Sequence, residues 1–138
     1  MHEERIGDTV VNGLLYGIVG GLVITLYLFV LGQFGGPKPQ DLLISLSPSV
    51  GETALAGFVA HLAVASIYGI LWGILYGWMG GRVRLPSWLL GLLYGLLLTC
   101  VVLIFRPPTQ LVPSVGFVYI LSAHMLYGLT LGYLQGRR

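Results

Sequence analysis

Residues 69–81 read GILWGILYGWMGG, with glycine at every fourth position of an otherwise apolar run. In water such a row would weaken a helix, because each glycine costs about 1 kcal/mol relative to alanine. In a bilayer, glycines four residues apart lie on one helix face and let two backbones come into close contact. The row therefore predicts a membrane helix that packs tightly on another helix, as in a glycine zipper.

Similar rows recur in each of the other apolar stretches. The glycines that we expect at helix contacts are Gly13, Gly17, Gly21, Gly69, Gly73, Gly77, Gly81, Gly91, Gly95, Gly128, Gly132 and Gly136. Each row lies in the half of its stretch nearer the same membrane face, and bulky side chains fill the other half. We expect a bundle that is pinched at one face and splayed at the other.

The composition is that of a membrane protein. Of 138 residues, 56% are hydrophobic and 9% are charged, and the mean hydropathy is +0.87. A helix needs roughly 20 apolar residues to cross the hydrocarbon core. Four stretches are long enough, at about 9–32, 53–80, 86–105 and 114–135. The sequence predicts an all-α integral membrane protein, a four-transmembrane-helix bundle that forms a single domain over 1–138.

The connection between the first two spans contains one further element. Residues 35–41 read GGPKPQD and break the helix, and Asp41 is expected to cap a short helix over the apolar residues that follow. This helix is too short to cross the membrane. We expect it in the outer interface or folded over the mouth of the bundle.

Repeated segments indicate a tandem duplication of a two-helix hairpin. GLLYG occurs at 13–17 and again at 91–95, and PSVG occurs at 48–51 and again at 113–116. A tyrosine precedes the glycine row at both Tyr68 and Tyr127. The repeat halves are about 9–82 and 86–136. Two hairpins in tandem keep the same orientation, so an axis along the membrane normal would relate them.

Basic residues predict the orientation of the chain. One side of the membrane would carry Arg5, Arg82, Arg84, Arg137 and Arg138, and the other Lys38 and Arg106. Basic loops stay on the cytoplasmic side. We therefore expect a protein integral to the plasma (inner) membrane, with both termini cytoplasmic.

The residue types argue against catalysis. No Asp, Glu, Lys or Arg lies inside the expected spans, and Cys100 is the single cysteine. Paired carboxylates, a cysteine metal cluster and the usual nucleophile motifs are therefore missing. The net charge of +2 comes from scattered residues, which does not favour nucleic-acid binding. We expect no catalytic residues and no metal site, and hence a protein that is not an enzyme.

Two histidines lie within the spans, and histidine is the side chain whose charge changes near neutral pH. His61 and His124 each continue the glycine row of their helix on its outer side. Counted from the outer ends of their spans they lie at similar depths, whereas counted from the inner arginines they do not. Three interpretations stay open: interhelical hydrogen bonds, a ligand or proton site, or axial ligation of a b-type haem or a chlorophyll-type pigment. Tyr68 and Tyr127 could line such a site.

The leading functional expectation is a non-enzymatic interaction or assembly subunit, whose glycine rows dock into a homo-oligomer or a larger membrane complex. Its partners would be membrane lipids, further copies or other membrane subunits, without a cofactor. One alternative is a haem or pigment protein that uses His61 and His124, with haem iron bound only in that case. A second alternative is a small oligomeric transporter or channel.

Overall fold

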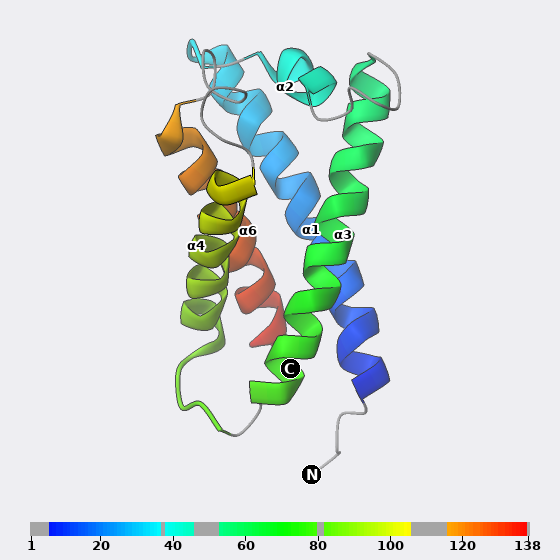
Figure 1. Ribbon diagram of the computed structural model, residues 1–138, viewed down its shortest axis with the longest axis vertical. Coiled ribbons are helices and arrows are strands. Elements are labelled where there is room, and N and C mark those ends of the chain that lie inside the picture. Colours follow the sequence, from blue (N-terminus) through cyan, green and yellow to red (C-terminus); the bar gives the residue numbers. More distant parts are fainter. Residues whose placement is uncertain (1–5, 37, 46–52, 80–81, 106–115, 138) are drawn as a thin grey trace.

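The computed structural model describes residues 6–36, 38–45, 53–79, 82–105 and 116–137. Within these ranges every regular element is a helix (Figure 1). The helices are α1 (Ile6–Gln33), α2 (Pro39–Ser45), α3 (Ala54–Met79), α4 (Ser87–Phe105) and α6 (Phe117–Gln135). All except α2 are long and apolar enough to cross a membrane. The prediction of an all-α bundle of four membrane-spanning helices is confirmed.

The lengths of the helices suit this role. Even the two shorter ones, α4 and α6, have 19 residues each, which at 1.5 Å per residue reach roughly 28 Å. That length matches the hydrocarbon core. The longer α1 and α3, with 28 and 26 residues, extend past it. Apolar side chains surround all four helices although only 17–33% of each span is buried inside the bundle, which is typical of membrane-spanning helices.

Helices α1 and α3 form the first pair, in which glycine backbones touch. A Cβ atom on Gly17 would lie 2.9 Å from Cα of Gly69, and one on Gly69 would lie 2.6 Å from Cα of Gly17. Real Cβ atoms essentially never come so close to backbone atoms. The two helices cross at these glycines and diverge beyond them (Figure 1). Glycine is therefore required on both sides of this crossing.

Helices α4 and α6 form the second pair, which repeats the contacts of the first. Each contact of a glycine between α1 and α3 has a counterpart at the equivalent positions of α4 and α6. Written with the α1–α3 contact first, the four matches are Gly13–Gly69 with Gly91–Gly128, Gly17–Ala65 with Gly95–His124, Gly73–Thr9 with Gly132–Ser87, and Gly77–Thr9 with Gly136–Ser87. Gly21 completes the first pair by lying against Ala65 and Leu62. Every expected contact glycine thus lies against a helix of the same chain, apart from Gly81, which is outside the described residues.

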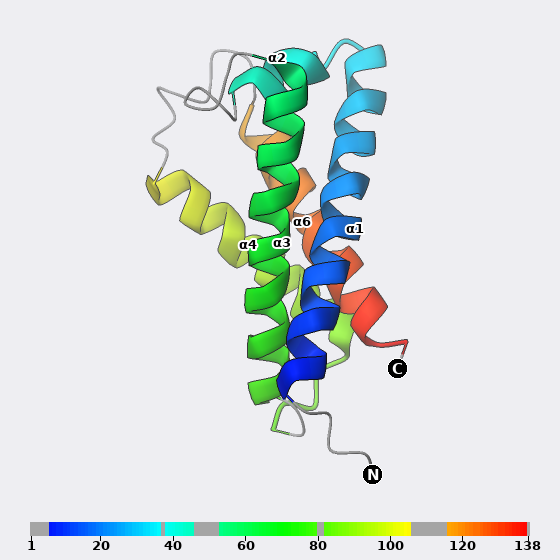
Figure 2. The same ribbon diagram turned by 90° about the vertical axis from the view of Figure 1, so that its right-hand side faces the viewer.

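The two pairs meet along two helix–helix contacts, α1 with α6 and α3 with α4, which we call seams. The two seams differ in how closely their helices pack. In the α1–α6 seam, the ring of Tyr127 lies over Gly20, where a Cβ atom would be 2.7 Å from the ring. The α3–α4 seam is less extensive, and α4 leans away from α3 toward its C-terminal end (Figure 2). The bundle is therefore closed along one seam and only partly closed along the other.

Helix α2 lies between the diverging ends of α1 and α3, at the end of the bundle opposite the chain termini (Figure 1). It packs backbone against backbone on α3, with the carbonyl of Leu43 against Gly57. Its start corrects one expectation, since the helix begins at Pro39 and the Lys38 carbonyl accepts bonds from the amides of Asp41 and Leu42. Asp41 thus lies in the first turn instead of capping it, because proline suits the first helical position.

Candidate functional site

His61 on α3 forms part of the contact between α1 and α3. Its Nε2 lies 3.2 Å from the carbonyl oxygen of Gly21 on α1, and the hydroxyl of Thr25 donates to the same oxygen at 3.0 Å. Because a carbonyl only accepts, Nε2 carries a proton, and in the neutral imidazole Nδ1 then has a lone pair. The imidazole is therefore an interhelical donor, and its second nitrogen is a potential acceptor.

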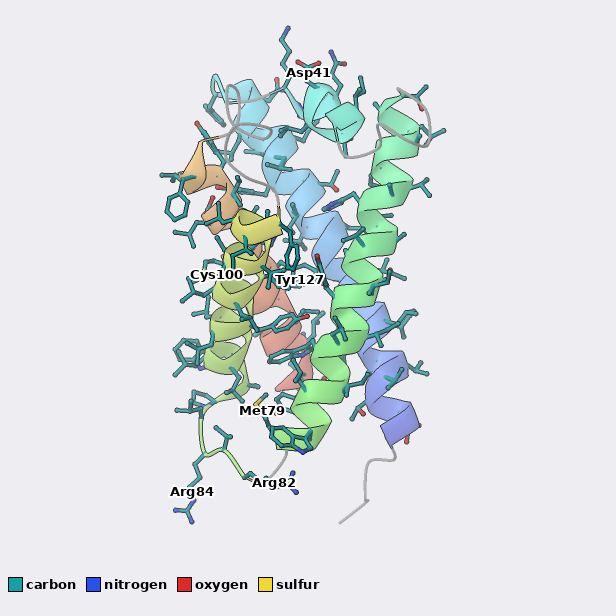
Figure 3. The ribbon with its side chains drawn as sticks, viewed as in Figure 1. Asp41, Met79, Arg82, Arg84, Cys100 and Tyr127 are labelled. Carbon is teal, nitrogen blue, oxygen red and sulfur yellow. The ribbon has the colours of Figure 1, made fainter. Side chains whose placement is uncertain are left out.

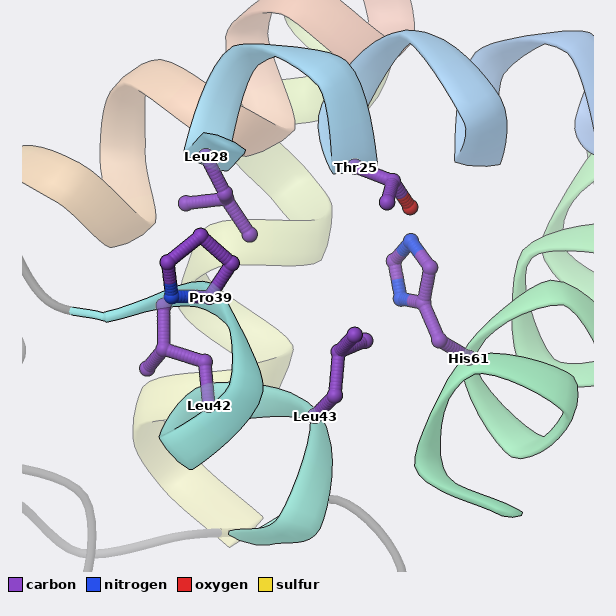
Figure 4. A pocket seen from close by; sticks show the side chains of 6 residues that line it. All are labelled: Thr25, Leu28, Pro39, Leu42, Leu43 and His61. Carbon is purple, nitrogen blue, oxygen red and sulfur yellow. The ribbon is translucent and has the colours of Figure 1, made fainter. Parts of the chain in front are cut away.

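A small hollow lies beside this imidazole, under α2. Its wall is formed by Thr25 and Leu28 from α1, Pro39, Leu42 and Leu43 from α2, and His61 (Figure 4). The volume of the hollow is about 20 Å³. A single water needs roughly 10–15 Å³. The hollow therefore has no more volume than one water needs, and it is far too small for a porphyrin ring or an organic solute.

His124 on α6 belongs to the second pair. Its Nδ1 lies 2.8 Å from the carbonyl oxygen of Ile120, one turn earlier in the same helix, so the bond lies within α6. The backbone of His124 lies against Gly95 of α4, the position that Ala65 occupies relative to Gly17 in the first pair. In the register of the helix contacts, His124 therefore corresponds to Ala65 and not to His61.

The two histidines thus sit in different helix pairs and at different contact positions. In the register of the helix contacts His61 lies four residues, or about one helical turn, from the position equivalent to His124. This separation lies between those given by the two counts along the chain. A haem with two axial histidines needs both imidazoles directed at one iron between them. Each described imidazole is instead bonded to a backbone carbonyl of its own pair.

The two tyrosines expected near the histidines act across the seams. Tyr127 is 2% exposed, and its hydroxyl donates to the carbonyl of Ala65 at 2.5 Å. Tyr68 contributes its backbone, whose carbonyl accepts a 2.7 Å bond from the hydroxyl of Tyr94. Figure 3 places Tyr127 in the middle of the bundle. These residues therefore tie the second pair to α3.

Several contributing residues were not singled out from the sequence. The hydroxyls of Tyr27 and Ser122 lie 2.7 Å apart and link α1 to α6. Gly20 lies against the ring of Tyr127, and Gly57 lies against the backbone of α2 at Leu43. The doublet of Gly20 with Gly21 could have revealed a second contact face on α1. Nothing in the sequence pairs Tyr27 with a residue so distant along the chain.

Two buried polar atoms have no partner among the described residues. They are Nε1 of Trp72, in a side chain that is 1% exposed, and Oε1 of Gln135, in one that is 4% exposed. The indole of Trp72 lies against the rings of Tyr76 and Tyr94, with centroids 5.4 and 5.3 Å away. Trp72 is therefore a core residue at the junction of the two pairs and not a lipid-facing one.

The described residues contain no group of three or more His, Cys, Asp or Glu side chains that could hold a metal ion. Cys100 lies exposed on α4 (Figure 3). Comparison with known proteins finds no matching family model, no matching curated protein and no matching solved structure. Function must therefore be argued from the contacts of this chain.

Proposed function

We propose that this protein is a non-enzymatic membrane subunit that presents a preformed helical body to a partner, either further copies of itself or other subunits of a membrane complex. One observation carries the proposal: intramembrane polar groups hold the helices together. His61 bonds α3 to α1, Tyr94 and Tyr127 donate to carbonyls of α3, and Tyr27 bonds to Ser122. Groups engaged in this way contribute to the fold and are not free to handle a substrate.

The docking surface must differ from the glycine rows, because these are occupied within the chain. The outward face of α4 is the alternative that we favour. It carries exposed apolar side chains at Leu93, Leu97, Cys100 and Ile104. Their spacing of four, three and four residues is that of helices packed side by side. Because the α3–α4 seam is only partly closed, α4 packs mainly on α6, whereas α1 packs on both α3 and α6. This supports a partner on the outward face of α4.

The single cysteine allows a direct test in native membranes. If copies meet along α4, mild oxidation should link two chains through Cys100, and Cys100→Ser should abolish the link. Leu97→Trp should reduce it without changing the far-ultraviolet circular dichroism. Val11→Trp is the matched control, because Val11 is exposed on α1.

A heteromeric partner would be detected by a photoreactive residue at position 97. Its product should migrate above the single chain and should be absent with the reagent at position 11. If the protein runs as one chain in lipid nanodiscs at every concentration and neither reagent gives a product, the assembly proposal is wrong.

We also propose a plasma (inner) membrane location with cytoplasmic termini. The support is that Arg82, Arg84 and Arg137 lie at the end of the bundle where α1 begins and α6 ends (Figure 3), since basic segments stay in the cytoplasm. Reporter enzymes fused to each terminus should both be active on the cytoplasmic side. A periplasmic signal from either fusion would contradict this orientation.

We further infer that the two helix pairs descend from one duplicated hairpin. The support is the one-to-one correspondence of their glycine contacts, which extends the GLLYG repeat of α1 and α4 to the partner helices. Convergent packing would not require the same register on all four helices. The halves about 9–82 and 86–136 are then structural repeats, and expressing both halves as separate chains should reconstitute the bundle.

The remaining alternatives have less support. A haem or pigment held by His61 and His124 would need both rings directed at one metal, whereas each imidazole is bonded within a different helix pair. A small oligomeric transporter or channel would need a solute path, and the hollow beside His61 has no more volume than one water needs. Colour in the purified protein, or solute flux in liposomes, would revive the corresponding alternative.

A further inference from the structure

Three aromatic side chains mark the membrane interface at the end of the bundle that carries the termini. Trp78 near the end of α3 is 68% exposed, Trp88 at the start of α4 is 48% exposed, and Tyr133 near the end of α6 is 54% exposed. Trp and Tyr gather at the level where lipid chains meet headgroups. These rings therefore define the depth at which this end meets the headgroups.

Arginines follow two of these rings by four residues. The guanidinium of Arg82 lies 5.6 Å from the ring centroid of Trp78, and that of Arg137 lies 4.9 Å from the ring centroid of Tyr133. Trp and Tyr rings lie at the level of the headgroups, so guanidinium groups held against them are within reach of lipid phosphates. Arg82 also donates through Nη1 to the carbonyl of Trp78. The bond and the ring hold the guanidinium while other N–H groups stay free.

The charge at this end is unbalanced among the described residues. Arg82, Arg84 and Arg137 are exposed, and the described acidic residue at this end is Asp8, in the first turn of α1. Figure 3 shows Arg82 and Arg84 at the end opposite Asp41. At that opposite end the described charges, Lys38 and Asp41, cancel.

We propose that this end of the protein binds the phosphate groups of anionic phospholipids through Arg82, Arg84 and Arg137. The guanidinium fork fits two phosphate oxygens at once. On Trp78 and Tyr133 a ring face already carries an arginine, so a choline cation cannot bind to that face. A lipid satisfies the site better than free phosphate does, since its chains contact the exposed rings while its phosphate meets the arginines. This proposal is independent of the assembly proposed above.

The test is lipid retention in native mass spectrometry. The protein is reconstituted in nanodiscs that contain phosphatidylglycerol and phosphatidylcholine in equal amounts, and the retained lipids are counted. The wild type should retain phosphatidylglycerol in excess. Each arginine replaced by glutamine should lower that excess by about fivefold, in line with the attraction of one basic residue to an anionic surface. The variants are Arg82→Gln, Arg84→Gln and Arg137→Gln, singly and combined.

Controls separate the possible sources of the effect. Lys38→Gln, at the opposite end, should keep the wild-type excess, and Arg82→Lys should keep most of it because the charge remains. An excess that persists in the triple variant would overturn the proposal. Inorganic phosphate in nanodiscs of phosphatidylcholine alone should not raise the midpoint of thermal unfolding, and a rise equal to that from phosphatidylglycerol would identify a soluble anion as the ligand. If the triple variant does not insert, the single variants decide.

Discussion

The α1–α6 seam and the α3–α4 seam join the same two helix pairs, and the register of the glycine contacts makes them counterparts. Gly20 and Tyr127 in the first correspond to Leu98 and Tyr68 in the second. Tyr127 lies over Gly20 and is 2% exposed, whereas Leu98 fills the equivalent space with its own side chain. We therefore expect the side chain at this position to determine how closely the two helices of each seam meet.

The two seams also differ in their halves nearer α2, where again the α1–α6 seam is the one with a bond across it. Tyr27 and Ser122 are bonded across the α1–α6 seam. Their counterparts are Phe105, which is 79% exposed, and the exposed Ala63, and these side chains cannot form such a bond. The two pairs thus share the same glycine contacts between their own helices, yet the packing of one pair on the other differs between the two seams. That geometry depends on a few side chains outside the glycine rows.

The largest effect should come from disrupting either pair. Gly69→Leu places a side chain where Cα of Gly17 lies 2.6 Å from Cβ, and Gly128→Leu does the same in the second pair. Overpacking costs about 1–3 kcal/mol and more where backbone must move, so each should lower the free energy of unfolding by about 3 kcal/mol. Unfolding in mixed micelles, followed by circular dichroism, measures the loss.

Gly7→Leu is the control for this pair of variants, because nothing lies within 4 Å of a Cβ at Gly7. It should leave the free energy of unfolding unchanged. Equal losses for Gly69→Leu and Gly128→Leu would strengthen the correspondence between the pairs. A loss in one pair only would break it.

The next effect concerns the closed seam. Gly20→Leu gives α1 the residue that α4 has at position 98, and its Cβ would lie 2.7 Å from the Tyr127 ring. The ring is held by its bond to Ala65, so we expect a loss of about 1–3 kcal/mol and a more open α1–α6 seam. Val19→Leu, on an exposed part of α1, should change little. Wild-type stability in Gly20→Leu would mean that the glycine does not determine the closed seam.

A smaller effect is expected from the tyrosine hydroxyls. Tyr127→Phe removes the bond to Ala65, and Tyr94→Phe removes the bond to the Tyr68 carbonyl. Hydrogen bonds between membrane helices contribute about 0.6–2 kcal/mol, so each variant should lose that much in free energy of unfolding. Tyr133→Phe, exposed to the surroundings, provides the baseline. Losses no larger than this baseline would show that packing alone holds the seams.

The smallest effects distinguish the histidines. His61→Ala removes a bond between helices, although Thr25 still donates to the same carbonyl, so the loss should be about 0.6 kcal/mol. His124→Ala removes a bond within α6 and should lose less. A larger loss in His124→Ala would reverse this order. An absorption band near that of haem in the wild type, absent in both variants, would instead assign the pair to a cofactor.

Much of the architecture could be predicted from the sequence. Glycine spacing, hydropathy and length were enough for the four spans, because each depends on local composition. The short helix after Gly35 was expected as well, although Pro39 begins it and Asp41 does not. Local signals of this kind are strong because backbone geometry limits which residues are tolerated.

The arrangement of the site could not be predicted in the same way. Glycine rows are alike, so nothing in them states that α1 must pair with α3 and α4 with α6. The positions of His61 and His124 depend on the crossing points of two separate pairs, which a count along the chain does not capture. The contact of Tyr27 with Ser122 joins residues from opposite halves and leaves no periodic signal.

The positions of the three tryptophans make the intrinsic fluorescence of the protein sensitive to its packing. Trp72 is 1% exposed at the junction of the pairs, whereas Trp78 and Trp88 face the surroundings. Brominated lipids quench fluorescence on contact, so they should quench Trp78 and Trp88 and leave the emission of Trp72. The residual emission then reports directly, without any label, whether the two hairpins remain docked on each other.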